Sequence, residues 1–159
     1  MDIATTDPDP GGRAASLLDL FARANHLLTA AFQERLKEHG IAATEWRVLA
    51  ALAGRDGAAM SELADEVLLK QPTLTKAVDR LERAGLVERH TPSADRRRTL
   101  VHLTERGRGL TVPLLAAARQ HELWLDRILG EEESRDLRAA LTRVIERLAF
   151  TPPPARDEF

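Results

Sequence analysis

The stretch Met60–Thr104, MSELADEVLLKQPTLTKAVDRLERAGLVERHTPSADRRRTLVHLT, decides the fold of this chain. It contains two short helical segments, and Gly85 is suited to ending the second one in the left-handed conformation. Two strand-like runs joined by a polar, basic loop follow. This order predicts a helix-turn-helix with a two-stranded β-hairpin, or wing, beside it.

The second helical segment has an apolar side and a polar side. Leu74, Val78 and Leu81 recur at helical spacing and are expected in the core. The first turns of such a helix enter the DNA major groove, where Gln pairs with adenine, Thr contacts a thymine methyl or a phosphate, and Lys reaches guanine or a phosphate. The predicted DNA-binding residues of this helix are Gln71, Thr73, Thr75, Lys76 and Arg80.

The loop between the strand-like runs Leu86–Arg89 and Thr99–Leu103 carries one acidic residue followed by three arginines. Arginine at a hairpin tip can reach the adjacent minor groove, where narrow A·T-rich DNA deepens the negative potential. A neighbouring carboxylate can hold such an arginine by paired hydrogen bonds and aim it. The predicted DNA-binding residues of the wing are Asp95, Arg96, Arg97 and Arg98.

The charges of the chain are unevenly distributed. The net charge is −2, yet Lys70–Arg108 contains ten Lys or Arg and five Asp or Glu, so this block carries +5 and the remainder −7. Each of these charges taken alone could equally belong to an ordinary solvated helix face or turn. Their combination in this order favours a DNA-docking surface on an acidic frame.

Several other functions are disfavoured by composition. The chain of 159 residues has no Cys, which removes disulfides, thiolate metal sites and thiol-based redox sensing. It contains no nucleophile elbow and no phosphate-binding Gly loop, so no enzyme is expected. Its five His show no helical i, i+4 pair, and neither a metal nor a cofactor is predicted. Without a membrane span or a secretory signal, the expected location is the cytoplasm.

The rest of the chain is expected to be mainly α-helical. Thr44, Ser61 and Thr104 are expected to cap three of the helices. The apolar stripes of the first and last helices are expected to pack on other helices, including those of a second subunit. The predicted divisions are a disordered N-terminus at 1–12, a dimerisation helix at 13–43, the winged helix-turn-helix lobe at 44–104, two further dimerisation helices at 105–149, and a disordered tail at 150–159.

Three motifs carry a family resemblance: SELAD at 61–65, LTKAVDRLERAGLVER at 74–89, and DRRxxxxxLT from Asp95 to Thr104. With them, the chain resembles the MarR (multiple antibiotic resistance regulator) family of winged-helix transcription factors over about residues 15–149. The resemblance implies a homodimer clasped by its terminal helices on a pseudo-palindromic operator, a repressor released by a small-molecule effector. It also implies that Asp95 and Arg97 act together at the wing tip.

The resemblance further implies an effector site between the dimerising helices and the DNA-binding lobe, commonly for an aromatic acid. The candidate lining residues are Asn25, His26, Trp46 and Arg47. Trp46 could instead be a core residue and His26 a surface residue. The competing function is a helical interaction protein whose winged helix binds a protein partner, against which the basic block argues.

Overall fold

The computed structural model describes residues 16–91 and 99–150, with side chains as far as residue 148. The disorder predicted for 1–12 and for 151–159 lies outside the described residues, whereas Phe150, predicted to begin the disordered tail, is helical. The helices are α1 (Leu17–Glu38), α2 (Ala43–Leu52), α3 (Met60–Glu66), α4 (Gln71–Arg83), α5 (Glu105–Leu129) and α6 (Glu131–Phe150). The strands are β1 (Ala58–Ala59), β2 (Val87–His90) and β3 (Leu100–Leu103). The predicted mainly α fold with a β-hairpin is confirmed.

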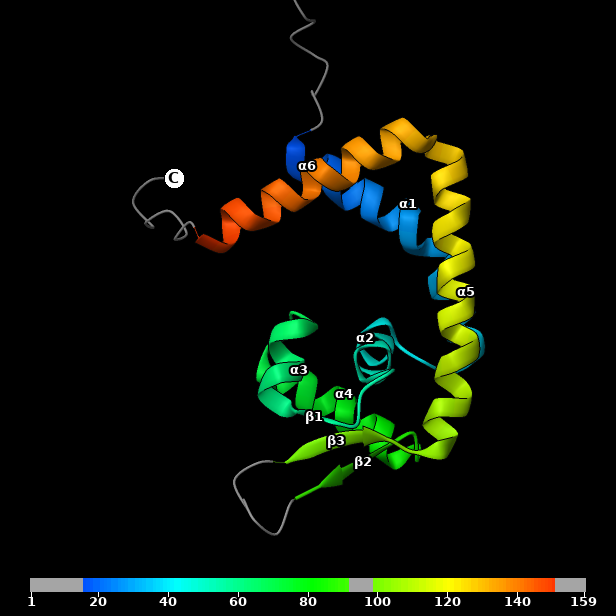
Figure 1. Cartoon of the computed structure of the whole chain (residues 1–159), viewed down its shortest axis with the longest axis vertical. Coiled ribbons are helices and arrows are strands. Elements are labelled where there is room, and N and C mark those ends of the chain that lie inside the picture. Colours follow the sequence, from blue (N-terminus) through cyan, green and yellow to red (C-terminus); the bar gives the residue numbers. More distant parts are fainter. Residues whose placement is uncertain (1–15, 92–98, 151–159) are drawn as a thin grey trace, which may run out of the picture.

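Helices α2, α3 and α4 pack together over the sheet and form a lobe at the lower end of the molecule (Figure 1). Its core contains the predicted stripe of α4, together with fully buried side chains of the other elements. These are Val48, Leu49, Leu52, Leu63, Leu74, Val78, Leu81 and Val101. Burying each of the larger ones contributes about 1.5–3 kcal/mol. The apolar spacing of α4 therefore fixes which of its sides is left facing solvent.

The sheet has three strands, one more than predicted. Its order is β1-β3-β2, with Ala58 paired to Val101 in one antiparallel ladder and Val87 paired to Leu103 in the other. Strand β1 is two alanines long and has no alternating pattern that could reveal it. Gly57, at φ +84°, turns the chain onto β3, and a Cβ there would lie 2.4 Å from the His102 ring. A glycine is required at this close approach.

Two of the three predicted helix caps are wrong. Helix α2 begins at Ala43, and the Ala42 N–H donates to Glu45 Oε2 at 2.8 Å. Helix α3 begins at Met60, with the same bond from the Ala59 N–H to Glu62 at 3.2 Å. In both cases the helix starts before the expected hydroxyl residue, and an acidic side chain in the first turn accepts the free N–H. Thr104 caps α5 as predicted, accepting from the Gly107 N–H at 2.9 Å.

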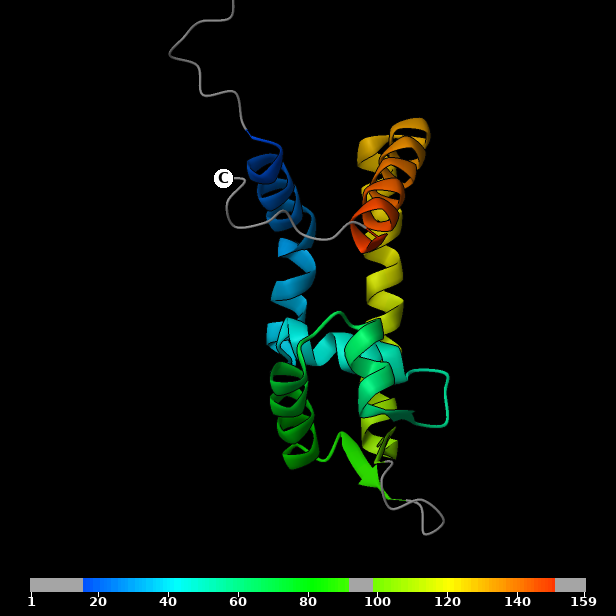
Figure 2. The same cartoon turned by 90° about the vertical axis from the view of Figure 1, so that its left-hand side faces the viewer.

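Helices α1, α5 and α6 form a frame that extends away from the lobe. In the turned view, α1 stands on one side of the upper end, and α5 with α6 on the other (Figure 2). Leu36 of α1 and Leu114 of α5 are buried in the lobe core and join the frame to it. Within the described ranges, no helix is long and apolar enough to span a membrane.

The frame exposes many large apolar side chains. On α1 these are Leu17, Leu18, Leu20, Phe21 and Leu27; on α5 Val112, Leu123, Trp124 and Ile128; and on α6 Leu137, Val144, Ile145 and Leu148. Single exposed apolar residues are common on soluble proteins, but a concentration of this size marks an interaction surface.

Candidate nucleic-acid interface and ligand cavity

The side of α4 that faces away from the core carries the predicted recognition residues. Gln71, Thr73, Thr75, Lys76 and Arg80 are all exposed. The Thr75 hydroxyl donates to the Gln71 carbonyl at 2.9 Å, so its hydrogen is already engaged within the helix. The structure thus brings these five side chains to one accessible helix surface, and their role in DNA binding stays a prediction.

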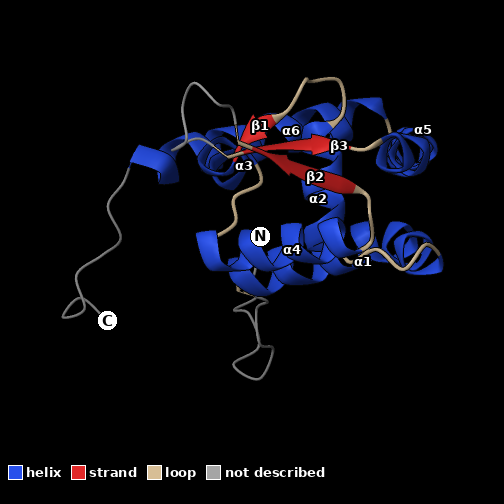
Figure 3. Cartoon of the chain, turned by 90° about the horizontal axis from the view of Figure 1, so that it is seen from below, coloured by secondary structure: helices blue, strands red, loops and turns tan. Residues whose placement is uncertain are grey.

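Strand β2 lies against α4, so the base of the wing and α4 form one surface (Figure 3). Arg89 of β2 joins them, because its Nη2 lies 2.6 Å from Asp79 Oδ1 and its Nη1 lies 2.5 Å from Glu82 Oε2. Partial burial acts to lower the pKa of Arg89, but the hydrogen bond with Asp79 and the attraction of Glu82 raise it above its usual value. Arg89 therefore pairs with two carboxylates of α4 and offsets one of their two negative charges.

Arg89 was not among the predicted site residues. Arg89 lies on β2, beyond the end of the helix that carries its two partners, so helical spacing does not predict the contact and only the tertiary structure reveals it. The predicted wing-tip residues Asp95, Arg96, Arg97 and Arg98 lie outside the described residues, and their roles stay predictions.

A cavity of about 390 Å³ lies where the frame meets the lobe. It is lined by Asn25, Leu28, Thr29, Phe32, Trp46, Ala118, His121, Glu122, Leu125, Leu129, Ser134, Leu137, Arg138 and Leu141. Two of the four predicted effector residues, Asn25 and Trp46, are therefore at the cavity.

The other two predicted effector residues lie elsewhere. His26 is exposed on α1 and is not among the lining residues. Arg47 donates from Nη2 to the Val67 carbonyl at the end of α3. Arg47 therefore braces α2 against the turn of the helix-turn-helix, because successive helical residues point about 100° apart and Trp46 takes the cavity side.

Aromatic rings follow one another from the lobe into the frame. Trp46 packs edge-on against Phe32, with centroids 5.3 Å apart, and Phe32 stacks on His121 at 6.1 Å. His121 stacks in turn on Trp124 at 5.3 Å, and its Nε2 lies 2.7 Å from the Leu28 carbonyl. Phe32 and His121 were missed as cavity residues because their position depends on how α1 crosses α5.

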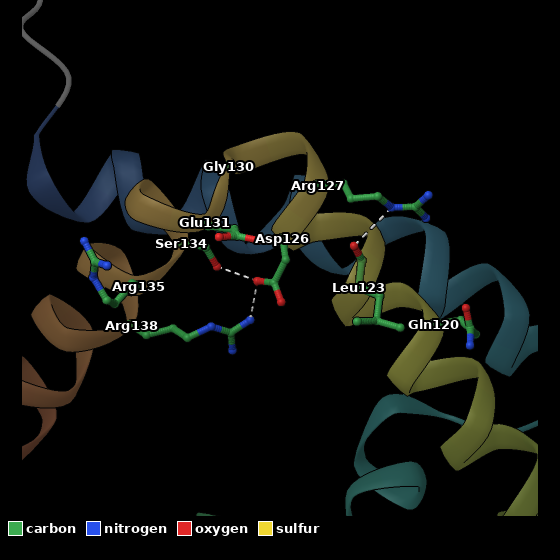
Figure 4. Close-up of a pocket in the computed structure, with 9 residues that line it drawn as sticks. All are labelled: Gln120, Leu123, Asp126, Arg127, Gly130, Glu131, Ser134, Arg135 and Arg138. Atoms are coloured by element: carbon green, nitrogen blue, oxygen red, sulfur yellow. Dashed lines mark hydrogen bonds and ion pairs between the residues drawn. The ribbon is translucent and has the colours of Figure 1, made fainter.

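Two charged residues that line the cavity, Glu122 and Arg138, are paired at the corner between α5 and α6, where Arg138 also contacts Asp126 (Figure 4). Arg138 Nη2 lies 2.7 Å from Asp126 and 3.1 Å from Glu122, and the Ser134 hydroxyl donates to Asp126 at 2.5 Å. The hydrogen bonds from Ser134 and then Arg138 hold the pKa of Asp126 below its usual value. The same carboxylates raise the pKa of Arg138. Arg138 thus carries a charge that is already offset by two carboxylates.

A second, more open hollow of about 880 Å³ lies on the other side of this corner, lined by residues that include Gln120, Leu123, Arg127 and Arg135. In the part of the chain that the structure describes, no group of three or more potential ligands could hold a metal ion.

The known proteins to which this chain is similar in sequence and fold are transcriptional regulators. A family model described as MarR family matches residues 39–98. The crystal structure of the MarR family transcriptional regulator SPO1453 from Silicibacter pomeroyi DSS-3 is 32% identical, with a TM-score of 0.74, over 84% of this chain and 95% of that one. The chain belongs to the MarR family. The predicted winged helix-turn-helix, transcription-regulating protein is thereby confirmed, and MarR-family regulators are DNA-binding proteins rather than enzymes.

Two solved structures similar to this MarR-family chain contain a bound molecule. One is an S. aureus MepR–DNA complex, 25% identical with a TM-score of 0.76, over 83% of this chain and 98% of MepR. The other is NadR in complex with 4-hydroxyphenylacetate, 28% identical with a TM-score of 0.67, over 87% of this chain and 97% of NadR.

Proposed function

We propose that this chain is a homodimeric, sequence-specific regulator that binds a pseudo-palindromic double-stranded DNA operator in the cytoplasm and represses transcription until a small-molecule effector releases it. The observation that carries the proposal is the accessible polar and basic side of α4 beside the wing, at the end of the molecule opposite the uncovered apolar frame. The MepR–DNA complex supports DNA as the partner of this fold.

The second copy of the chain is the proposed occupant of the apolar frame. Covering exposed residues of α1, α5 and α6 removes apolar surface from water, which contributes roughly 25 cal/mol per Å² before association costs. A two-fold dimer built this way presents two copies of α4. They can read two half-sites when they lie about 34 Å, one turn of DNA, apart.

DNA binding by α4 is tested with Lys76→Ala. Lys76 is exposed on α4, and losing one phosphate contact should weaken binding to duplex DNA roughly tenfold. The slope of log K against log salt should become shallower by about 0.9. Arg97→Ala in the wing should act in the same direction. Fluorescence anisotropy over a series of salt concentrations measures both quantities.

The matched control for Lys76→Ala is Arg143→Ala, which removes one exposed positive charge from α6, far from α4. It should leave affinity and slope unchanged. Equal effects of Lys76→Ala and Arg143→Ala would assign the binding to net charge and not to α4.

We propose an aromatic acid as the effector, bound in the 390 Å³ cavity. Phe32, Trp46 and His121 offer ring faces, and the NadR complex supports a phenolic acid as a ligand of this fold. The acid carboxylate must compete for Arg138 with Glu122, the more distant of its two partners. The cavity is lined by residues of both the lobe and the frame. A ligand that binds better to a dimer with a different separation of its two α4 helices therefore shifts the population of dimers away from the DNA-binding conformation. A nearly complete release requires about 5.5 kcal/mol of differential binding.

Titration with 4-hydroxyphenylacetate tests the effector site by tryptophan fluorescence. Both tryptophans, Trp46 and Trp124, belong to the row of aromatic contacts that includes the cavity residues Phe32 and His121. Saturable quenching of tryptophan fluorescence and release of bound DNA are expected. Asn25→Ala should weaken the ligand roughly fivefold, the effect of one hydrogen bond. His26→Ala, one residue away but outside the cavity, should not; equal losses would place the ligand elsewhere.

A further inference from the structure

We infer that Glu45 is a positioning residue for DNA recognition: it restrains the guanidinium of Arg80 and so limits the affinity of the protein for DNA of random sequence. This inference rests on the proposed function, with α4 as the recognition helix. It adds a residue of α2 that lies outside the recognition helix and the wing.

Glu45 is itself held in place. Its side chain is only 9% exposed, and its Oε2 accepts the Ala42 N–H at 2.8 Å as the first-turn acid of α2. Its other oxygen, Oε1, lies 3.8 Å from Arg80 Nη1. A buried carboxylate is costly without compensating partners, and the Ala42 N–H and the Arg80 guanidinium are two such partners of Glu45. The carboxylate is thus a fixed point from which Arg80 is restrained.

Arg80 lies at the border of the exposed side of α4. Arg80 comes seven residues, or about two helical turns, after Thr73, so the two residues lie on the same side of the helix. Glu82, on the opposite border, contacts Arg89 of β2. Because Glu45 belongs to α2, its pull draws the Arg80 guanidinium toward α2 and away from the centre of the exposed side. The Arg80 side chain is nevertheless 62% exposed and remains accessible to a phosphate.

A restrained arginine and a free arginine differ in what they contribute to DNA binding. Binding to random sequence depends on counterion release by cations that reach phosphates in any register. The negative charge of Glu45 offsets the positive charge of Arg80. The restraint also holds the Arg80 guanidinium at one position, so that it contacts a phosphate only when the DNA places one there. A correctly registered operator meets this requirement, whereas random DNA meets it rarely. Glu45 therefore raises the ratio of operator affinity to random affinity.

The decisive variant is Glu45→Gln. Its amide oxygen can still accept the Ala42 N–H, but the negative charge beside Arg80 is gone. The probes are a duplex of random sequence and a duplex selected from a randomised pool by the unaltered protein, both measured by anisotropy over a salt series. E45Q should bind the random duplex roughly three- to tenfold more tightly, with a slope steeper by up to about 0.9, and the specificity ratio should fall.

The partner variant Arg80→Ala shows whether the effect passes through Arg80. It should weaken binding to the random duplex, and adding E45Q to it should change nothing further, since the restrained group is absent. An E45Q effect of equal size with and without Arg80 would overturn the inference, as would an unchanged random affinity. If the unaltered protein binds neither duplex, the proposed function fails as well, so the two failures are distinguishable.

A measurement on the unaltered protein covers the case in which E45Q does not fold. The Arg80 Nε–H signal in ¹⁵N NMR, assigned by its loss in Arg80→Ala, should show a higher order parameter than that of Arg143, which is exposed on α6. An Arg80 signal as mobile as that of Arg143 would overturn the restraint.

Discussion

Ile145→Glu should separate the dimer into folded monomers and weaken operator binding by about 100-fold or more. Ile145 lies on α6 with 65% of its surface exposed in the single chain, so glutamate there disturbs little within one subunit. In the proposed dimer the same position is covered, and an unpaired carboxylate would be buried against apolar side chains. Two linked recognition helices gain roughly 10²- to 10⁴-fold over one from effective concentration, and monomers lose this gain.

Sedimentation velocity and anisotropy with the selected duplex measure the two effects of Ile145→Glu. Arg143→Glu is the control, because it changes the charge of the same helix by more but lies about 200° away around the helix axis and removes no apolar surface. It should remain dimeric. A dimeric I145E protein with unaltered DNA affinity would contradict the assignment of the frame to dimerisation.

The second large effect is expected from Arg89→Ala, which should weaken DNA binding about 30-fold. Arg89 pairs with Asp79 and Glu82 at 2.6 and 2.5 Å. Removing it leaves two carboxylates on the recognition helix without their cation, beside DNA phosphates that repel them. Repulsion between these carboxylates and the phosphates is expected to cost about 2 kcal/mol of binding free energy, which corresponds to this factor.

Two further variants separate the causes. Arg89→Lys replaces the planar guanidinium with a single ammonium, which cannot make both contacts. Its DNA affinity should therefore lie between those of the unaltered protein and Arg89→Ala. Adding Asp79→Asn and Glu82→Gln to Arg89→Ala removes the repulsion and should recover most of the affinity. If the triple variant stays as weak as Arg89→Ala, the main role of Arg89 is to place the wing; unchanged binding in Arg89→Ala would contradict both roles.

The features that were predictable from sequence are those written in local periodicity. The spacing of Leu74, Val78 and Leu81 indicated which side of α4 is buried, and therefore which residues are exposed. Gly85 takes a φ of +68° at the end of α4, as its position indicated. The charge block from Lys70 to Arg108 pointed to DNA because the excess of positive charge is local and not spread over the chain.

The features that were not predictable depend on contacts between distant segments. Strand β1 exists because Gly57 lets the chain approach His102 on β3, and two alanines carry no strand signal. Arg47 follows Trp46 directly, yet it bonds to Val67 while Trp46 reaches the cavity. Glu45 reads locally as a helix-start residue, and its contact with Arg80 appears only when α2 packs across α4.

The most direct test of the central claim is a hydroxyl-radical footprint of the unaltered protein on a duplex selected from a randomised pool. A dimer whose two α4 helices are joined through the frame should protect two segments of related, inverted sequence. The centres of these segments should lie about 10 base pairs apart, which is one turn of DNA, on the same face of the duplex. A single protected segment, or protection without any repeated sequence, would contradict a dimer that reads two half-sites with α4.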